Sequence, residues 1–363
     1  MDVVLLSHSG SYRHFEISTT MHPNATMTTE TEVKLVKTIS PVLSAEVYEA
    51  LIMFLTYTSL FCTIVGIFSN ALVITVYTKI GFSDTVNISY LALGISDLSL
   101  STIRFWGAVC YTFVVTKTNV PFDPLGITVT TSFFPGQGFE KATAFITAFI
   151  ALERCLCVQF PLHVKRIVTT KKTVTSIVII FLCAFTPSNF IHMVFPLKWE
   201  FNPAQNKSIL VVVPLQTPLR YIIQRALLAY YGTVLHFTAL IAVWIFTIFL
   251  AVGLKKTAEI RKDNFKQSNN KGNKQKERRI IKTVFLLAVT YLICSIPTAV
   301  TLLVPHFEPE FETSRGLARI SRFSHVLSAL MTVINSNANL FIFIYMGSKF
   351  RETLGRLFCK KYP

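Results

Sequence analysis

The chain has 363 residues, of which 52% are apolar and 15% are charged, and its formal net charge is +16. A soluble domain carries about a quarter charged residues, so this composition argues against a soluble globular protein. The positive balance alone could suggest a nucleic-acid partner, but the Lys and Arg residues border long apolar stretches. Because that placement is typical of the cytoplasmic face of a membrane protein, we expect the lipid bilayer as a partner and no nucleic acid.

Seven apolar segments are long enough to cross a bilayer, whose hydrocarbon core requires about 20 apolar residues in a helix. The third segment is the least hydrophobic, and its assignment rests partly on its motifs. The predicted fold class is therefore an all-α membrane protein with a seven-transmembrane helix bundle at residues 50–346. The expected spans are Ala50–Tyr77, Val86–Val115, Gly136–Val158, Thr173–Phe195, Ala226–Leu254, Thr283–Val304 and Phe323–Met346.

The two ends of the chain differ from this bundle in composition. Residues 1–49 are rich in Thr, Ser and Glu without apolar periodicity, which predicts a flexible extracellular arm. Residues 347–363 predict a short amphipathic helix and a cytoplasmic tail, because four apolar residues share one helical face: Phe350, Leu354, Leu357 and Phe358. Cys359 at the end of this helix is a candidate for palmitoylation, and an unmodified thiol is the equal alternative.

The distribution of basic residues predicts that the N-terminus lies outside. With that orientation, the third inside loop alone holds eleven Lys and Arg between Lys255 and Lys282, more than the three outside loops hold together. The glycosylation sequons at Asn24 and Asn206 then fall outside, as glycan addition requires. A third sequon at Asn87 lies at the cytoplasmic end of the second span, and we expect it to stay unmodified.

The strongest motif is Glu153-Arg154-Cys155 at the cytoplasmic end of the third span, followed seven residues after Arg154 by Pro161-Leu162. This arrangement resembles the Asp/Glu-Arg-Tyr motif of rhodopsin-like (class A) G-protein-coupled receptors. In that family an acid at the base of the sixth helix also holds the arginine, and Glu277, twenty residues before Pro297, stands at the matching place. The resemblance implies a charge-assisted pair that breaks when the sixth helix moves outward. For Glu153-Arg154 alone, the alternative is a capping ion pair.

The sixth and seventh spans keep part of the family's activation motifs. The seventh retains Asn339 of the family's Asn-Pro-x-x-Tyr motif, with Leu340 in place of the proline and Phe343 in place of the tyrosine. The sixth retains Pro297, which should bend the helix, but has Ser295 where the family has tryptophan. The resemblance implies G-protein coupling through Glu153, Arg154, Glu277, Pro297, Asn339 and Phe343.

The family's disulfide at the outer end of the third helix has no counterpart in this sequence. Val129 occupies the expected cysteine position, and residues 196–225 contain no cysteine. Cys110 lies near the outer face without an evident partner.

Asp97 in the second span is a carboxylate at mid-membrane depth, where it must be paired, hydrated or neutralised. The family gathers polar side chains around this position and often binds a sodium ion there, and oxygen ligands suit such a cation. A water-filled hydrogen-bond network without an ion is the equal alternative. The resemblance implies a possible sodium site formed by Asp97, Thr143, Asn335, Ser336 and Asn339, with Asn70 nearby.

A ligand is expected between the outer halves of the spans. Arg104 lies two helical turns outward from Asp97, and Glu140 is its nearest candidate partner by depth. We favour an internal Arg104–Glu140 pair over direct contact of Arg104 with a ligand, and we expect Arg104 to favour an acidic ligand. Weaker candidates are Tyr230, Tyr231, His236 and His325, because aromatic side chains in such helices are more often packing residues.

One group within the family is more similar than the rest. Five runs are similar to molluscan chemosensory receptor-like proteins, which are related to FMRFamide-type neuropeptide receptors: residues 81–89, 153–158, 161–165, 199–203 and 346–351. The sequence thus predicts a plasma-membrane receptor, not an enzyme, that binds an extracellular chemical cue or short peptide and activates a heterotrimeric G protein. The alternative is a multi-pass transporter or channel, which the absence of an internal repeat disfavours. A light sensor is excluded because the seventh span has no lysine for a Schiff base.

Overall fold

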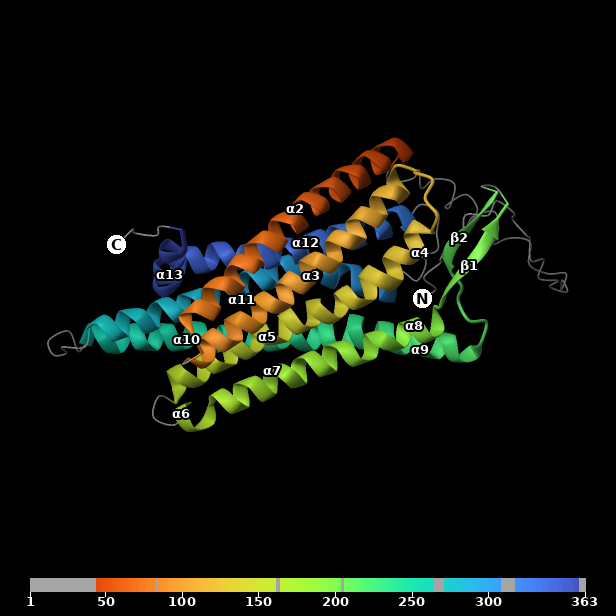
Figure 1. Cartoon of the computed structure of the whole chain (residues 1–363). Coiled ribbons are helices and arrows are strands. Elements are labelled where there is room, and N and C mark those ends of the chain that lie inside the picture. The colour runs from red at the N-terminus through yellow and green to blue at the C-terminus, as the bar shows by residue number, and fades with distance from the viewer. Residues whose placement is uncertain are drawn as a thin grey trace.

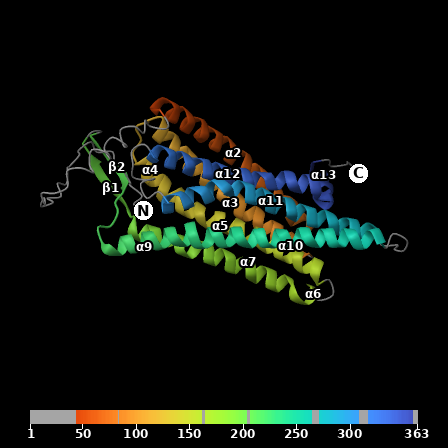
Figure 2. The ribbon, with the colours of Figure 1, turned by 180° about the vertical axis from the view of Figure 1, so that it is seen from behind.

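A computed structural model describes residues 44–82, 84–160, 164–203, 206–263, 271–307 and 317–358. Within this part of the chain, seven helices are long and apolar enough to cross a membrane, which confirms the predicted fold class. They form one elongated bundle, with a β-hairpin at one end and a short C-terminal helix at the other (Figures 1 and 2). Asn24 and Cys359 lie outside the described residues.

The spans are longer than the apolar pattern predicted, and three of them are composite. The first two are α2 (Ala45–Ile80) and α3 (Thr85–Val115). The third consists of α4 (Pro124–Thr128), a π-helical segment (Val129–Phe133) and α5 (Phe134–Gln159), and the short helix α6 (Val164–Ile167) follows it. The fourth consists of α7 (Thr170–Phe185), a 3-10 turn (Thr186–Asn189) and α8 (Phe190–Val194). The fifth consists of α9 (Pro218–Leu228), a second π-helical segment (Ala229–Leu235) and α10 (His236–Asp263). The sixth and seventh are α11 (Lys271–Phe307) and α12 (Leu317–Met346), and α13 (Ser348–Phe358) ends the described chain.

The third span begins at Pro124 rather than at the expected Gly136, because an N-cap starts the helix early. The carboxylate of Asp123 accepts hydrogen bonds from the backbone N–H groups of Leu125 and Gly126, both at 3.2 Å. Proline at the first helical position needs no such partner, so the cap and Pro124 together favour this start.

The loop between the fourth and fifth spans folds into an antiparallel hairpin that the sequence pattern did not predict. Strand β1 (Leu197–Asn202) pairs with β2 (Lys207–Val212), and Asn206 in the turn has a φ of 51°. Two backbone hydrogen bonds, from Asp123 N–H to Leu210 O (2.8 Å) and from Leu210 N–H to Pro121 O (3.0 Å), attach β2 to the start of the third span. No disulfide forms among the described cysteines, so these bonds hold the loop where the family uses one.

The third span is the central helix of the bundle. In its most apolar stretch 61% of the residues are buried, against 44% or less in each of the other six spans. Side chains on this helix therefore face neighbours on several sides, which allows it to carry polar groups that lipid would not tolerate.

An aromatic cluster of Tyr77, Tyr90, Phe343 and Phe350 attaches α13 to the end of the bundle. The ring of Phe350 lies 5.5 Å from that of Tyr77 and 5.8 Å from that of Phe343. Phe350 is buried, whereas Leu357 and Phe358 on the same predicted apolar face are exposed. The amphipathic helix thus packs with its beginning on the protein and leaves its later apolar residues for the membrane surface.

Close approach of α2, α3 and α12 depends on a glycine. A Cβ atom at Gly66 would lie 2.5 Å from Ser101 Oγ and 2.7 Å from Asn337 Oδ1, and Asn337 Nδ2 donates to Cys62 O at 2.9 Å. Any larger side chain at residue 66 must therefore displace the side chains of Ser101 and Asn337.

We expect Gly66→Leu to destabilise the protein by about 1–3 kcal/mol, because overpacking a tight helix contact forces backbone shifts. The measurement is the unfolding temperature of the purified protein, together with its surface level in cells. Gly355→Leu is the matched control, since a Cβ at Gly355 meets no atom within 4 Å. Equal behaviour of the two variants would contradict this account of the packing.

Candidate functional site

Four ionisable side chains form a buried group in the half of the bundle nearer the hairpin, which we call the ionic cluster: Arg104, Glu140, Lys141 and His236. Glu140 accepts from Arg104 Nη2 through Oε2 at 3.2 Å and from Lys141 Nζ through Oε1 at 2.8 Å. Lys141 Nζ also lies 3.2 Å from His236 Nδ1. The internal Arg104–Glu140 pair that the sequence favoured therefore forms, and a single carboxylate serves two cations.

Local backbone features make room for this cluster. The guanidinium of Arg104 packs against Gly136, where a Cβ would lie 3.2 Å from both its Cζ and its Nε. The two π-helical segments, Val129–Phe133 and Ala229–Leu235, precede the cluster residues on the third and fifth spans. A π-helical turn inserts an extra residue and rotates the residues beyond it, so these segments set which side chains point inward. His236 is the first residue after the second of them.

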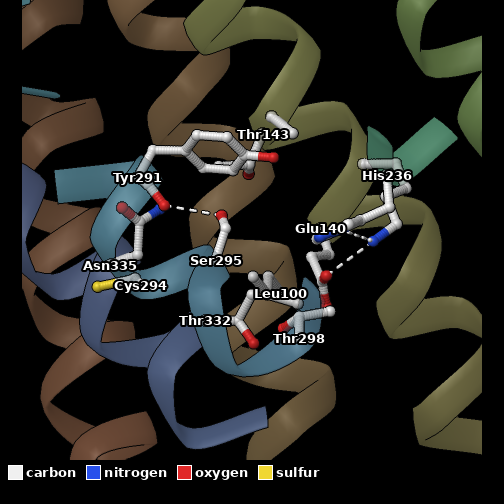
Figure 3. A pocket seen from close by; sticks show the side chains of 12 residues that line it. Leu100, Glu140, Thr143, His236, Tyr291, Cys294, Ser295, Thr298, Thr332 and Asn335 are labelled. Carbon is white, nitrogen blue, oxygen red and sulfur yellow. Dashed lines mark hydrogen bonds and ion pairs between the residues drawn. The ribbon is translucent and has the colours of Figure 1, made fainter. Parts of the chain in front are cut away.

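A cavity of about 380 Å³ opens beside the ionic cluster (Figure 3). Glu140 and His236 lie on one side of it, and Tyr291 and Asn335 lie on the other. Its lining comes from five spans: Leu100, Glu140, Lys141, Thr143, Ala144, His236, Tyr291, Cys294, Ser295, Thr298, Thr332 and Asn335. Ser295 donates to its own helix, at Tyr291 O (2.7 Å). The cavity volume includes space open to the surroundings, and its enclosed part is only about 10 Å³, room for about one water molecule.

Asp97 lies in a second polar group that adjoins the cavity through Thr143. Its Oδ1 accepts from Thr143 Oγ1 at 2.8 Å and its Oδ2 accepts from Asn339 Nδ2 at 2.6 Å. Asn70 Nδ2 donates to Ser336 Oγ at 2.9 Å. The Oδ1 atoms of Asn335 and Asn70 are buried, and no hydrogen bond reaches them from the part of the chain that the structure describes. Thr143 and Asn339 are thus brought to Asp97, Asn70 pairs with Ser336, and Asn335 lines the cavity with an amide oxygen that has no hydrogen bond among the described residues.

At the opposite end of the bundle, Glu153 and Arg154 are both buried but do not bond to each other. The carboxylate of Glu153 accepts from Ser89 Oγ and from Thr173 Oγ1, both at 3.0 Å, which ties α5 to α3 and α7. Across the described residues, Arg154 has no ion pair within 4 Å and its Nε has no hydrogen-bond partner. Glu277 lies within α11, but its side chain is outside the described part.

The remaining ligand candidates lie away from the cavity lining. The hydroxyl of Tyr230 donates to Cys183 O (3.1 Å) and that of Tyr231 to Ala184 O (2.7 Å), so both tie the fifth span to α7. His325 lies on α12 with an exposed side chain. None of the three contributes to the cavity described above.

The contact between Lys141 and His236 was not predicted from the sequence. An apolar pattern read at ideal helical spacing gives no indication of a π-helical segment, so the inward direction of His236 could not be derived. The available signal was Lys141 itself: a lysine inside a span is costly in lipid and implies a partner in the bundle. Only 1% of the Lys141 surface is exposed, so its ammonium group requires a partner inside the bundle.

Two comparisons with known proteins bear on the site. A family model described as serpentine type 7TM GPCR chemoreceptor Srw matches residues 56–361. The chain is also 24% identical over 330 residues to an "fMet-Leu-Phe receptor" from Oryctolagus cuniculus, an alignment that covers 85% of this chain and 82% of the relative. Both matches span the bundle, including every residue of the ionic cluster.

We expect Glu140→Gln to be more destabilising than Arg104→Gln. The first change leaves Arg104 and Lys141 buried without a carboxylate and should cost about 3–5 kcal/mol, whereas the second leaves the Glu140–Lys141 pair intact. The measurement is the unfolding temperature of each purified variant. Glu352→Gln, which breaks an exposed pair with Arg356, is the control and should change stability by less than about 0.5 kcal/mol. If Arg104→Gln proves the more damaging change, Glu140 is not the shared counter-ion.

Proposed function

Because the chain belongs to the serpentine chemoreceptor family Srw of G-protein-coupled receptors, we propose that it is a plasma-membrane receptor for an extracellular chemical cue or short peptide and that it activates a heterotrimeric G protein. The observation that carries the ligand part of this proposal is the buried ionic cluster beside a cavity. Such a group is expensive to bury, and packing alone does not require it.

The similarity to a receptor named for fMet-Leu-Phe favours a peptide among these cues. The cytoplasmic motifs also resemble those of molluscan chemosensory and FMRFamide-type receptors, and this resemblance likewise favours a peptide. The excess of basic residues in the third inside loop supports an orientation with the N-terminus outside.

The proposed switch is at Arg154. Ligand binding favours the conformation in which α11 has moved outward and a cytoplasmic cleft is open to the G protein. The absence of any ion pair to Arg154 among the described side chains leaves it available to Glu277, which supports this assignment. Glu153 in turn is held by Ser89 and Thr173, so it acts as an anchor for α5 and does not compete for the arginine.

We expect Glu277→Ala to raise basal G-protein activation severalfold, because it removes the acid that restrains Arg154 in the inactive state. Arg154→Ala should give no such rise. The measurement is ligand-free G-protein activation in cells that express each variant at the same surface level. Glu352→Ala is the control, since it removes an acid at the same end of the molecule without touching the switch. If all variants and the wild type match untransfected cells for every G-protein class, the coupling proposal fails.

We propose further that the oxygen atoms around Asp97 bind a sodium ion in the inactive receptor. The support is chemical: the buried Asp97 carboxylate accepts from Thr143 and Asn339, the Oδ1 atom of Asn335 is buried without a hydrogen-bond partner among the described residues, and oxygen ligands suit a hard cation. The residues that would hold the ion are Asp97, Thr143, Asn335, Ser336 and Asn339.

We expect sodium chloride to raise the unfolding temperature of the purified wild type above its value in choline chloride at equal ionic strength, because an ion that binds only the folded state stabilises it. Asp97→Asn should abolish that difference. The control is Glu153→Gln, which changes a buried carboxylate outside the proposed ion site. A wild type that does not distinguish the two salts would indicate a water network in place of an ion.

A further inference from the structure

The ionic cluster has a surplus of positive charge. Arg104 and Lys141 each contribute one positive charge and Glu140 contributes one negative charge, so the three together carry a net charge of +1. The Asp97 carboxylate, which contacts the cavity-lining Thr143, accepts from neutral donors and makes no ion pair within the described part of the chain. An uncompensated cation inside a membrane bundle is costly, so the cluster is suited to a further anion.

The cluster also has hydrogen-bond donors without partners. The ammonium of Lys141 can only donate, so His236 Nδ1 must be the acceptor of their contact at 3.2 Å. A neutral imidazole that accepts at Nδ1 carries its proton at Nε2. The Nε2 atom of His236 is buried, with no hydrogen-bond partner among the described residues, and the same is true of Arg104 Nε. A buried donor without an acceptor is unfavourable unless a ligand or water supplies one.

Part of this cluster lies at the cavity. Lys141, His236 and Glu140 line it, whereas Arg104 does not, and the rest of the wall is apolar or neutral. Glu140 bonds Arg104 through Oε2 and Lys141 through Oε1, so an anion that meets Lys141 and His236 leaves the Arg104–Glu140 pair in place. The enclosed part of the cavity has room for about one water-sized group, which admits a single carboxylate oxygen in this conformation.

We propose that Lys141 and His236 form the recognition site for the carboxylate of the receptor's ligand. This inference rests on the proposed function, because it names the chemical class of the extracellular cue. The residue expected to bind an acidic ligand is therefore no longer Arg104, which serves as the internal partner of Glu140. It is Lys141, which directly follows Glu140 on α5. The carboxylate could be the C-terminus of a short peptide or that of a small organic acid.

The test uses the full-length purified receptor in lipid nanodiscs, with unfolding temperature as the readout at constant ionic strength. Two matched pairs of probes distinguish the sources of the carboxylate. N-formyl-Met-Leu-Phe and its C-terminal amide represent a peptide end, and 3-phenylpropionate and 3-phenylpropionamide represent a small organic acid. We expect the acid of at least one pair to stabilise the wild type and its amide not to do so. Stabilisation by the peptide acid alone assigns the site to a peptide C-terminus.

We expect Lys141→Met to raise the acid concentration needed for the same stabilisation by about tenfold or more, the loss expected for one charge-assisted contact. This variant should fold, since it leaves the Arg104–Glu140 ion pair, whose net charge is zero. His236→Phe, which keeps all charges of the cluster, should weaken the response in the same direction. Lys117→Met is the matched control, because Lys117 is exposed at the outer end of α3 and its loss should change nothing.

Two results would overturn the inference: acids that do not stabilise the wild type more than their amides, or an acid response that Lys141→Met retains in full. Neither result depends on G-protein coupling, because the readout is the stability of the purified protein. A receptor that binds the acid but fails every coupling assay would therefore contradict the proposed signalling and leave the carboxylate site standing.

Discussion

The structure depends on the high cost of an unpaired polar group inside a bilayer. This cost makes every crossing segment helical, and it gathers the ionisable side chains on the central helix, where neighbours surround them. Glu140 shows the result most clearly, because one carboxylate on α5 binds cations from α3 and from its own helix while α10 supplies the imidazole beside them. The ionic cluster thus connects α3, α5 and α10 in the half of the bundle nearer the hairpin. The rest of the bundle is held mainly by the packing of apolar side chains.

The number of spans and the position of the amphipathic helix followed from apolar length and periodicity, because lipid imposes a simple requirement on both. The Arg104–Glu140 pair could also be predicted, since two opposite charges at similar depth leave few alternatives. The hairpin and the two π-helical segments could not. The hairpin forms by backbone pairing of β1 with β2 and is attached by backbone bonds of Leu210 to Asp123 and Pro121, which no side-chain pattern encodes. A π-helical turn arises from packing between helices.

At the end of the bundle near α13, Phe343 stands where the family motif has a tyrosine, and aromatic packing holds it there. Phe343 packs at 4.8 Å from the ring of Tyr90 and 5.2 Å from that of Tyr77, and both distances fall in the range of favourable ring contacts. The cluster already contains the phenol hydroxyls of Tyr77 and Tyr90, and that of Tyr90 is buried without a hydrogen-bond partner among the described residues. Phe343 thus contributes aromatic packing between α2, α3, α12 and α13 without adding a further hydroxyl.

The buried charges of the described bundle add up to zero, but positive and negative charges are not matched locally. Three acids stand against three bases: Asp97, Glu140 and Glu153 against Arg104, Lys141 and Arg154. The outer group has one positive charge in excess, and Asp97 supplies the opposing negative charge next to the same cavity. A cation at Asp97 and an anion at Lys141 would each neutralise a local excess and attract each other across the cavity. Within one conformation this attraction favours joint occupation. Because the proposed sodium ion favours the inactive receptor and the ligand favours the active one, the conformational change acts in the opposite direction, and the net coupling is the sum of the two effects. Thr143, which lines the cavity and donates to Asp97, connects the two polar groups.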